Sequence, residues 1–144
     1  MKDKSKELTT SLKLINDRLH FEGEVEGNSP ISIDYIPPFG DNLGYTSLEL
    51  MMMSLSSCLA SALLVLLRRQ GKNIESFSIK SEGTRSQIHP TALEEVHLYI
   101  NINSDNLETG EIEKVISMSE SICPVWHMIK DKTRVIIHHQ INQI

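Results

Sequence analysis

The chain contains two cysteines, Cys58 and Cys123, and their local settings favour redox chemistry. Cys58 stands in the middle of the long apolar run "SLELMMMSLSSCLASALLVLLRRQG" (47–71), and Cys123 comes just before a proline in "SICPVW" (121–126). The second position resembles the N-cap of a short helix, where backbone N–H groups can stabilise a thiolate. We therefore infer a catalytic pair, in which one thiol attacks and the other resolves the oxidised product as a disulfide.

The other interpretation of Cys58 is ordinary helix packing. Ser54, Ser57, Cys58 and Ser61 have the spacing of one helix face. A stripe of small side chains lets another backbone approach closely or leaves a pocket above it. In the packing interpretation, Cys58 is a small hydrophobic residue with no chemical role.

A reactive thiol in the middle of a helix needs a cation nearby, because burial raises its pKa and no helix N-terminus is within reach. Arg68 and Arg69 lie ten and eleven residues further along the same helix, roughly 15 Å away, which is too far. Arg18 lies between apolar residues of an early strand, so it is a candidate, although a solvated strand position is the alternative. The remaining candidate cations are Arg85 and Arg134.

Glu49 could orient such an arginine, since it precedes Cys58 by nine residues on the same predicted helix. Its other interpretation is structural. Thr46 is the predicted N-cap, and a glutamate three residues later completes a capping box. The two roles can coexist.

These residues are positioned by a predicted α+β fold made of one domain, residues 1–144. Residues 1–10 are polar, and we expect them to be partly disordered. Alternation of apolar and polar residues predicts an N-terminal β-meander, and periodicity predicts a long central helix followed by a ββ-α-β half. The expected strands span 11–15, 18–25, 29–37, 74–85, 92–103 and 133–141, and the expected helices span 47–70 and 107–122, with a proline-started turn in 123–131.

The composition excludes several classes of function. The net charge of −5 argues against nucleic acid or an anionic membrane as a partner. Residues 50–67 carry no charge, yet four serines interrupt this stretch, so a buried core helix is favoured over a membrane span. The N-terminus "MKDKSKELTT" lacks an apolar signal segment, so we expect a reducing cytoplasm, where two cysteines serve packing or redox chemistry.

Histidines suggest zinc as a competing class. His127 follows Cys123 by four residues, and His138 and His139 share the last strand. Adjacent strand residues point to opposite faces, however, and the chain has no Cys-x-x-Cys pair. We therefore expect no metal site.

The block "GYTSLELMMMSLSSC" (44–58) together with "CPVW" (123–126) resembles the OsmC/Ohr family, the osmotically inducible protein C and organic hydroperoxide resistance proteins. The order of strands and helices agrees with this family over nearly the whole chain. The resemblance implies an intertwined homodimer with two sites at the subunit interface. It also implies reduction of organic hydroperoxides by a thiol peroxidase that an external dithiol, lipoyl-type or a small thiol, regenerates without a bound cofactor.

Carried over residue by residue, the resemblance makes Cys58 the peroxidatic and Cys123 the resolving cysteine. Arg18 becomes the thiolate partner and Glu49 its orienting carboxylate. The hydroperoxide branch has its glutamate one position earlier, where this chain has Leu48, so the chain matches the more general OsmC-like pattern. The alternative function is a non-catalytic binding module with an apolar ligand pocket at the dimer interface.

Overall fold

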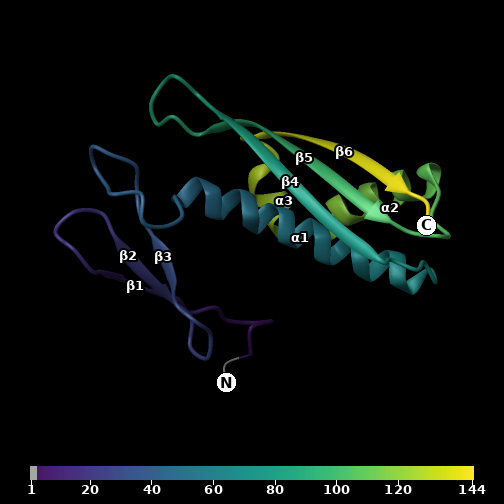
Figure 1. The fold of residues 1–144 in the computed structure, drawn as a ribbon, viewed down its shortest axis with the longest axis horizontal. Coiled ribbons are helices and arrows are strands. Elements are labelled where there is room, and N and C mark those ends of the chain that lie inside the picture. Colours follow the sequence, from purple (N-terminus) through teal and green to yellow (C-terminus); the bar gives the residue numbers. More distant parts are fainter. Residues whose placement is uncertain (1–2) are drawn as a thin grey trace. The chain divides into compact units, whose positions relative to one another are not determined.

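The computed structural model describes residues 3–144 and divides into two compact units, Met1–Leu50 and Met51–Ile144 (Figure 1). The boundary falls inside the long helix α1, Ser47–Arg69. The α+β class predicted from the sequence is confirmed, with two three-stranded sheets and three helices among the described residues. Residues 1 and 2 of the segment 1–10, for which partial disorder is expected, lie outside the described residues.

The first unit contains the predicted β-meander. Strands β1 (Ser11–Leu14), β2 (Phe21–Glu24) and β3 (Ile31–Ile33) pair antiparallel in that order. They are shorter than predicted because the turns between them include residues whose polarity alternates as it does along a strand. In the first turn, the Asn16 side chain accepts backbone N–H bonds from Arg18 and His20, at 3.0 and 3.1 Å, which bends the chain before β2 begins.

The loop after β3 is organised around one buried carboxylate. Asp34 is 3% exposed, and its oxygens accept backbone N–H bonds from Tyr35, Asp41 and Leu43 at 2.7, 3.1 and 3.0 Å. Burial opposes ionisation, but these hydrogen bonds outweigh it, so the pKa of Asp34 is lowered. Gly40 is required here, because a Cβ would lie 2.1 Å from the Tyr35 carbonyl oxygen. The loop is thus held rigid from within.

The second unit is a sheet covered on one face by helices. Strand order is β4 (Ser76–Arg85), β5 (Leu93–Asn103) and β6 (Arg134–Asn142), with β4 antiparallel and β6 parallel to β5. Helices α2 (Thr109–Ile122) and α3 (Pro124–Ile129) connect β5 to β6 (Figure 1). A parallel pair needs such a crossover, so the helical connection follows from the strand directions.

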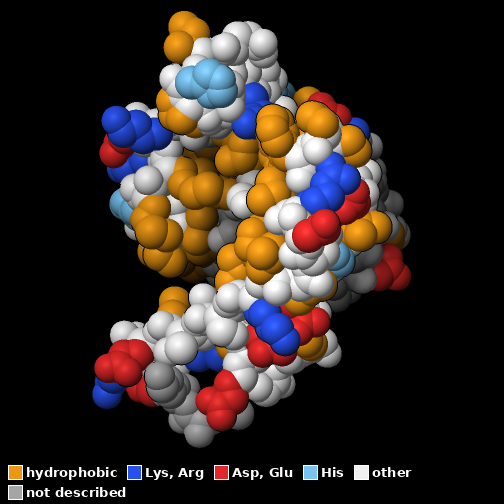
Figure 2. Space-filling view, turned by 90° about the vertical axis from the view of Figure 1, so that its left-hand side faces the viewer, with side chains coloured by type: hydrophobic (Ala, Val, Ile, Leu, Met, Phe, Trp, Pro, Cys, Tyr) orange, Lys and Arg blue, Asp and Glu red, His pale blue; other side chains and the backbone are white. Residues whose placement is uncertain are grey.

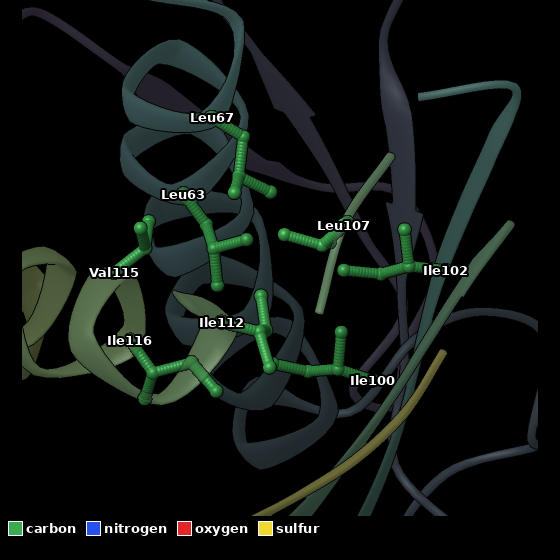
Figure 3. Packing of buried hydrophobic residues seen from close by; sticks show 8 residues of the cluster. All are labelled: Leu63, Leu67, Ile100, Ile102, Leu107, Ile112, Val115 and Ile116. Carbon is green, nitrogen blue, oxygen red and sulfur yellow. The ribbon is translucent and has the colours of Figure 1, made fainter. Parts of the chain in front are cut away.

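Alternation along β5 sorts its side chains between the two faces of this sheet. As predicted, Val96, Leu98, Ile100 and Ile102 point inward and are buried. Ile100 and Ile102 pack with residues of α1 and α2 in one hydrophobic cluster (Figure 3). Its members are Leu63, Leu67, Ile100, Ile102, Leu107, Ile112, Val115 and Ile116. Each large side chain buried in this way stabilises the fold by about 1.5–3 kcal/mol, which makes the cluster the main source of stability.

The buried residues of α2 form an inner stripe that ends at Ser119, whereas the neighbouring Met118 is exposed. The stripe consists of Ile112, Val115, Ile116 and Ser119. The buried Ser119 hydroxyl donates to the Val115 carbonyl at 2.7 Å, so its polar group is satisfied inside the core. The next helix position on this face is followed by Cys123, which caps α2 through an N–H bond to the Ser119 carbonyl at 3.0 Å.

Helix α1 is long and apolar enough to cross a membrane by length and hydropathy alone, a test that the core helix of a soluble protein also passes. Leu55, Leu59, Leu63 and Leu67 form a buried stripe along it, as in a core helix. The helix ends at Arg69, one residue before the predicted end, and Gly71 takes the predicted position after it with a φ of 74°; the Lys72 N–H donates to the Leu67 carbonyl at 3.0 Å in a Schellman motif.

Many apolar side chains remain outside these cores. Among residues 3–50 the structure buries only Asp34 and Gly40, both polar or small. Figure 2 shows hydrophobic side chains gathered together on the surface that this view presents. The exposed apolar residues include Leu12, Leu14, Ile36, Phe39, Leu43, Met51, Met53 and Val65. Surfaces of this kind mark interaction sites.

Candidate thiol redox site

The structure brings the two cysteines together. Cys58 lies near the middle of α1, Cys123 joins α2 to α3, and the two thiols are in hydrogen-bonding contact although 65 residues separate them in the chain. Both are free thiols, and they differ in exposure: Cys58 is half-buried and Cys123 is buried. Two thiols in direct contact are placed for thiol–disulfide chemistry, with the more accessible one open to a reactant.

Cys123 occupies the N-cap position that its proline indicated. Its sulfur accepts the Trp126 backbone N–H at 3.3 Å, and Pro124 fills the first helical position. Burial raises the pKa of Cys123, and the hydrogen bond and charge of Cys58 add to this. The hydrogen bonds from the Trp126 and Val125 N–H groups lower the pKa but offset only part of this increase. The resulting pKa is about 11. Cys123 therefore keeps its proton at neutral pH.

The small-residue stripe beside Cys58 faces outward. Ser54, Ser57 and Ser61 are exposed. Two of the hydroxyls are used within the helix, since Ser57 donates to the Ser54 carbonyl at 3.1 Å and Ser61 to the Ser57 carbonyl at 2.8 Å. This back-bonding leaves a shallow helix face without outward hydrogen-bond donors from these two hydroxyls, which suits an apolar neighbour or ligand.

Glu49 forms the predicted capping box. The Thr46 N–H donates to Glu49 Oε2 at 2.7 Å, and the Glu49 N–H donates to Thr46 Oγ1 at 3.3 Å. One carboxylate oxygen is thereby used at the helix N-terminus, where a negative charge is also favoured by the helix dipole. The second predicted role, orientation of an arginine, stays a prediction.

Arg18 is held inside the first unit. Its guanidinium donates to the Asp41 carboxylate and to the Pro38 carbonyl oxygen. Its predicted role as thiolate partner stays a prediction. Asp41 has no signal in the sequence that would connect it to Arg18, because the contact joins two loops 23 residues apart.

The other two candidate arginines are engaged away from the thiols. Arg85 donates to the Thr91 carbonyl and hydroxyl at 2.8 and 2.7 Å, and Arg134 pairs with Glu95 at 3.3 Å. Within the described part of the chain, no three His, Cys, Asp or Glu side chains gather as a metal cluster. The chemistry available at this site is thus that of the thiol pair itself.

The structure half-buries one carboxylate of α2 that the sequence analysis did not single out. Glu120 stands one turn before Cys123 on α2 and is half-buried, and burial raises its pKa. Its position beside the buried Ser119 at the edge of the inner stripe of α2 is the only signal that could have indicated this.

An α+β fold with one thiol inside a long helix and a second at a proline-started turn defines a class of thiol proteins. A sequence model of one such family, described as OsmC-like protein, matches residues 40–138, and the chain belongs to this family. A search of curated proteins found no match.

Solved structures agree with this assignment. An OsmC-like protein of unknown function from Vibrio cholerae has a TM-score of 0.83 at 16% identity, covering 94% of this chain and 99% of that one. A hypothetical protein from Aquifex aeolicus has a TM-score of 0.81 at 20% identity, with 94% and 96% covered. An organic hydroperoxide resistance protein OsmC from Legionella pneumophila has a TM-score of 0.69 at 18% identity, with 92% and 97% covered. The fold is therefore that of OsmC-like proteins.

Proposed function

We propose that this protein is a thiol-dependent peroxidase that reduces organic hydroperoxides through Cys58 and Cys123, in defence against oxidative stress. The observation that carries the proposal is the contact between the half-buried Cys58 thiol and the buried Cys123 thiol, whose pKa is raised to about 11. The organic hydroperoxide resistance proteins among the similar solved structures support the choice of substrate class.

In the first step the Cys58 thiolate attacks one oxygen of the hydroperoxide. The O–O bond breaks, Cys58 becomes a sulfenic acid, and the leaving alkoxide takes up a proton to become an alcohol. Cys58 suits this role because it is the more accessible thiol, while Cys123 with its pKa of about 11 remains protonated.

In the second step Cys123 attacks the sulfur of the Cys58 sulfenic acid. The S–O bond breaks, an S–S bond forms, and the Cys123 proton goes to the departing hydroxide, so that water leaves. Because of its high pKa, Cys123 still carries its proton and must give it up during this step. The direct contact of the two thiols means that the proton travels only a short distance. A dithiol then reduces the disulfide in two exchanges, giving back both thiols and leaving the reductant oxidised.

The proposal gives Arg18 and Glu49 supporting roles. Arg18 supplies the positive charge that holds the Cys58 thiolate, and Glu49 orients the guanidinium while it caps α1. The exposed apolar side chains of Met51 and Met53 favour an alkyl or lipid hydroperoxide over hydrogen peroxide. We place the reaction in the cytoplasm, with a lipoyl-type or small dithiol as reductant and no bound cofactor.

The same proposal includes a homodimer. Residues 3–50 bury no large apolar side chain, and α1 exposes Met51, Met53 and Val65 on faces that its leucine stripe leaves uncovered. A second copy would bury these surfaces in a closed two-fold interface. Sedimentation analysis should give a dimer, and a stable monomer at micromolar concentration would contradict this part of the proposal.

The decisive experiment is mass spectrometry after one equivalent of cumene hydroperoxide. The parent protein should form a Cys58–Cys123 disulfide and consume hydroperoxide continuously when a dithiol is supplied. Cys58→Ser should consume none, because a hydroxyl is a far poorer nucleophile at neutral pH. Cys123→Ser should turn over once and leave a sulfenic acid on Cys58 that dimedone can trap.

One further variant tests the proposed role of Arg18. Arg18→Ala should slow the first turnover, with an effect that shrinks as the pH rises, because the thiolate then needs no cation. If the parent consumes no hydroperoxide with any dithiol, or if both cysteine variants behave like the parent, the peroxidase proposal fails. The binding module with an apolar pocket would then replace it.

A further inference from the structure

The outer face of the β4-β5-β6 sheet carries a row of hydrogen-bonded side chains that the thiol chemistry does not use. Glu95 and His97 lie on β5, and His138 lies on β6, which is parallel to it. His97 Nε2 is 2.7 Å from Glu95 Oε1, and His97 Nδ1 is 2.9 Å from His138 Nε2. Because α1 and α2 cover the inner face of the sheet, this row of side chains lies on the solvent side.

With Glu95 ionised and His97 neutral, one assignment of protons to the ring nitrogens satisfies both hydrogen bonds. An ionised carboxylate can only accept, so His97 Nε2 bears the hydrogen and donates it to Glu95. The Nδ1 atom of the neutral His97 ring is then a lone-pair acceptor, and His138 Nε2 is its donor. One nitrogen of His97 is therefore aimed at His138 in the form that binds a metal ion, with a carboxylate behind it.

The two rings are nearly coplanar. Their planes differ by 9°, their centroids are 5.2 Å apart, and the facing nitrogens are 2.9 Å apart, which places the rings edge to edge. Tyr99 runs parallel to His138, with a centroid separation of 4.7 Å, and limits the tilt of that ring. Arg134 pairs with the second oxygen of Glu95 at 3.3 Å, so the carboxylate is fixed as well.

We propose that His97 and His138 form a binding site for a divalent transition metal ion of the kind that imidazole prefers, such as Ni²⁺ or Zn²⁺. Two metal–nitrogen bonds of about 2.0–2.1 Å to one ion place the nitrogens roughly 2.9–3.3 Å apart for angles between square and tetrahedral. The observed 2.9 Å meets this separation without movement of the strands.

Binding requires two small changes. The hydrogen on His138 Nε2 moves to Nδ1 of the same ring by exchange with solvent, so no net proton is released, and both rings turn about their broad terminal torsions so that the lone pairs converge on the ion. Glu95 then acts as the carboxylate that orients a metal-binding histidine from its far side. Water completes the coordination, since no third ligand from residues 3–144 is grouped with the pair.

This pair differs from the histidines that the sequence suggested. His139, the neighbour of His138, points to the opposite face and lies 3.7 Å from Glu113. His127 contacts the Ser121 carbonyl at 2.9 Å. The ring that contacts His138 belongs to His97, which is 41 residues away in the sequence and lies on another strand. Only the parallel register of β5 and β6 brings these two histidines together.

The test is calorimetric titration of the untagged full chain with Ni²⁺, in a Cys58→Ser/Cys123→Ser background so that no thiol can bind the metal. One Ni²⁺ should bind per chain. His97→Gln and His138→Gln should each weaken binding at least tenfold, and Glu95→Gln should weaken it about 10- to 100-fold. His139→Gln is the matched control, because it removes an adjacent histidine on the other face, and its affinity should be unchanged.

Circular dichroism on each variant checks that the sheet is intact, and imidazole NMR signals give a second readout. In the background protein Ni²⁺ should broaden the ring signals of His97 and His138 before those of any other histidine. The proposal is overturned if the background protein binds no Ni²⁺, if either His97→Gln or His138→Gln binds like the background, or if His139→Gln weakens binding as much as they do.

Discussion

The pKa of about 11 at Cys123 predicts a specific loss of stability in alkali. An ordinary thiol has a pKa of 9.0, so the unfolded chain gives up this proton near pH 9 while the folded protein keeps it until about pH 11. Over that interval the folded state binds more protons than the unfolded state, so the free energy of unfolding falls as the pH rises. Two pH units at 1.36 kcal/mol each correspond to a loss of about 3 kcal/mol.

The measurement is urea unfolding of the reduced protein at a fixed concentration and at several pH values from 7 to 11. Lysines and tyrosines also titrate in this range, so the comparison is with Cys123→Ala, in which the same groups remain. The stability of the parent should fall more steeply than that of the variant above pH 9, and the two should run parallel below it. Parallel curves over the whole range would show that Cys123 is not held protonated by its surroundings.

Three further changes should give distinct outcomes. Leu63→Ala opens the core cluster and should cost about 2–5 kcal/mol in urea unfolding, whereas the exposed Val65→Ala should cost little in the monomer. Gly40→Ala forces a methyl group to 2.1 Å from the Tyr35 carbonyl and should destabilise the protein by about 1–3 kcal/mol, while Gly110→Ala, with open space around its Cβ, should be neutral or stabilising in thermal melts. Glu49→Gln should leave stability nearly unchanged because the amide still reaches the Thr46 N–H, yet slow hydroperoxide consumption; an unchanged rate would leave Glu49 as a cap alone.

Local patterns predicted the elements of the second unit well. The alternation of Val96, Leu98, Ile100 and Ile102 predicted the buried face of β5, and Gly71 predicted the end of α1. These features depend on neighbours within a few residues. The N-cap role of Cys123 was predicted for the same reason, since Pro124 stands beside it.

Contacts between distant segments could not be predicted in this way. The Arg18–Asp41 pair depends on how two loops close, and the His97–His138 pair depends on the register of a parallel strand pair. The contact between Cys58 and Cys123 was inferred from the local setting of each cysteine and from the resemblance to a family, because no sequence pattern joins the two segments. The strands of the first unit were predicted too long, because turn residues such as Arg18 and His20 alternate in polarity with their neighbours like strand residues, but their N–H groups donate to the Asn16 side chain instead.

The N-cap of α3 has an optical consequence. The residue whose N–H group donates to the Cys123 sulfur is Trp126, the single tryptophan of the chain. Any change in the charge or bonding of that sulfur acts on the backbone of the residue that carries the one indole, which dominates the intrinsic emission of the protein. Oxidation and reduction of the thiol pair should therefore change the fluorescence intensity of the unlabelled protein, so that a stopped-flow fluorimeter can follow both half-reactions in real time.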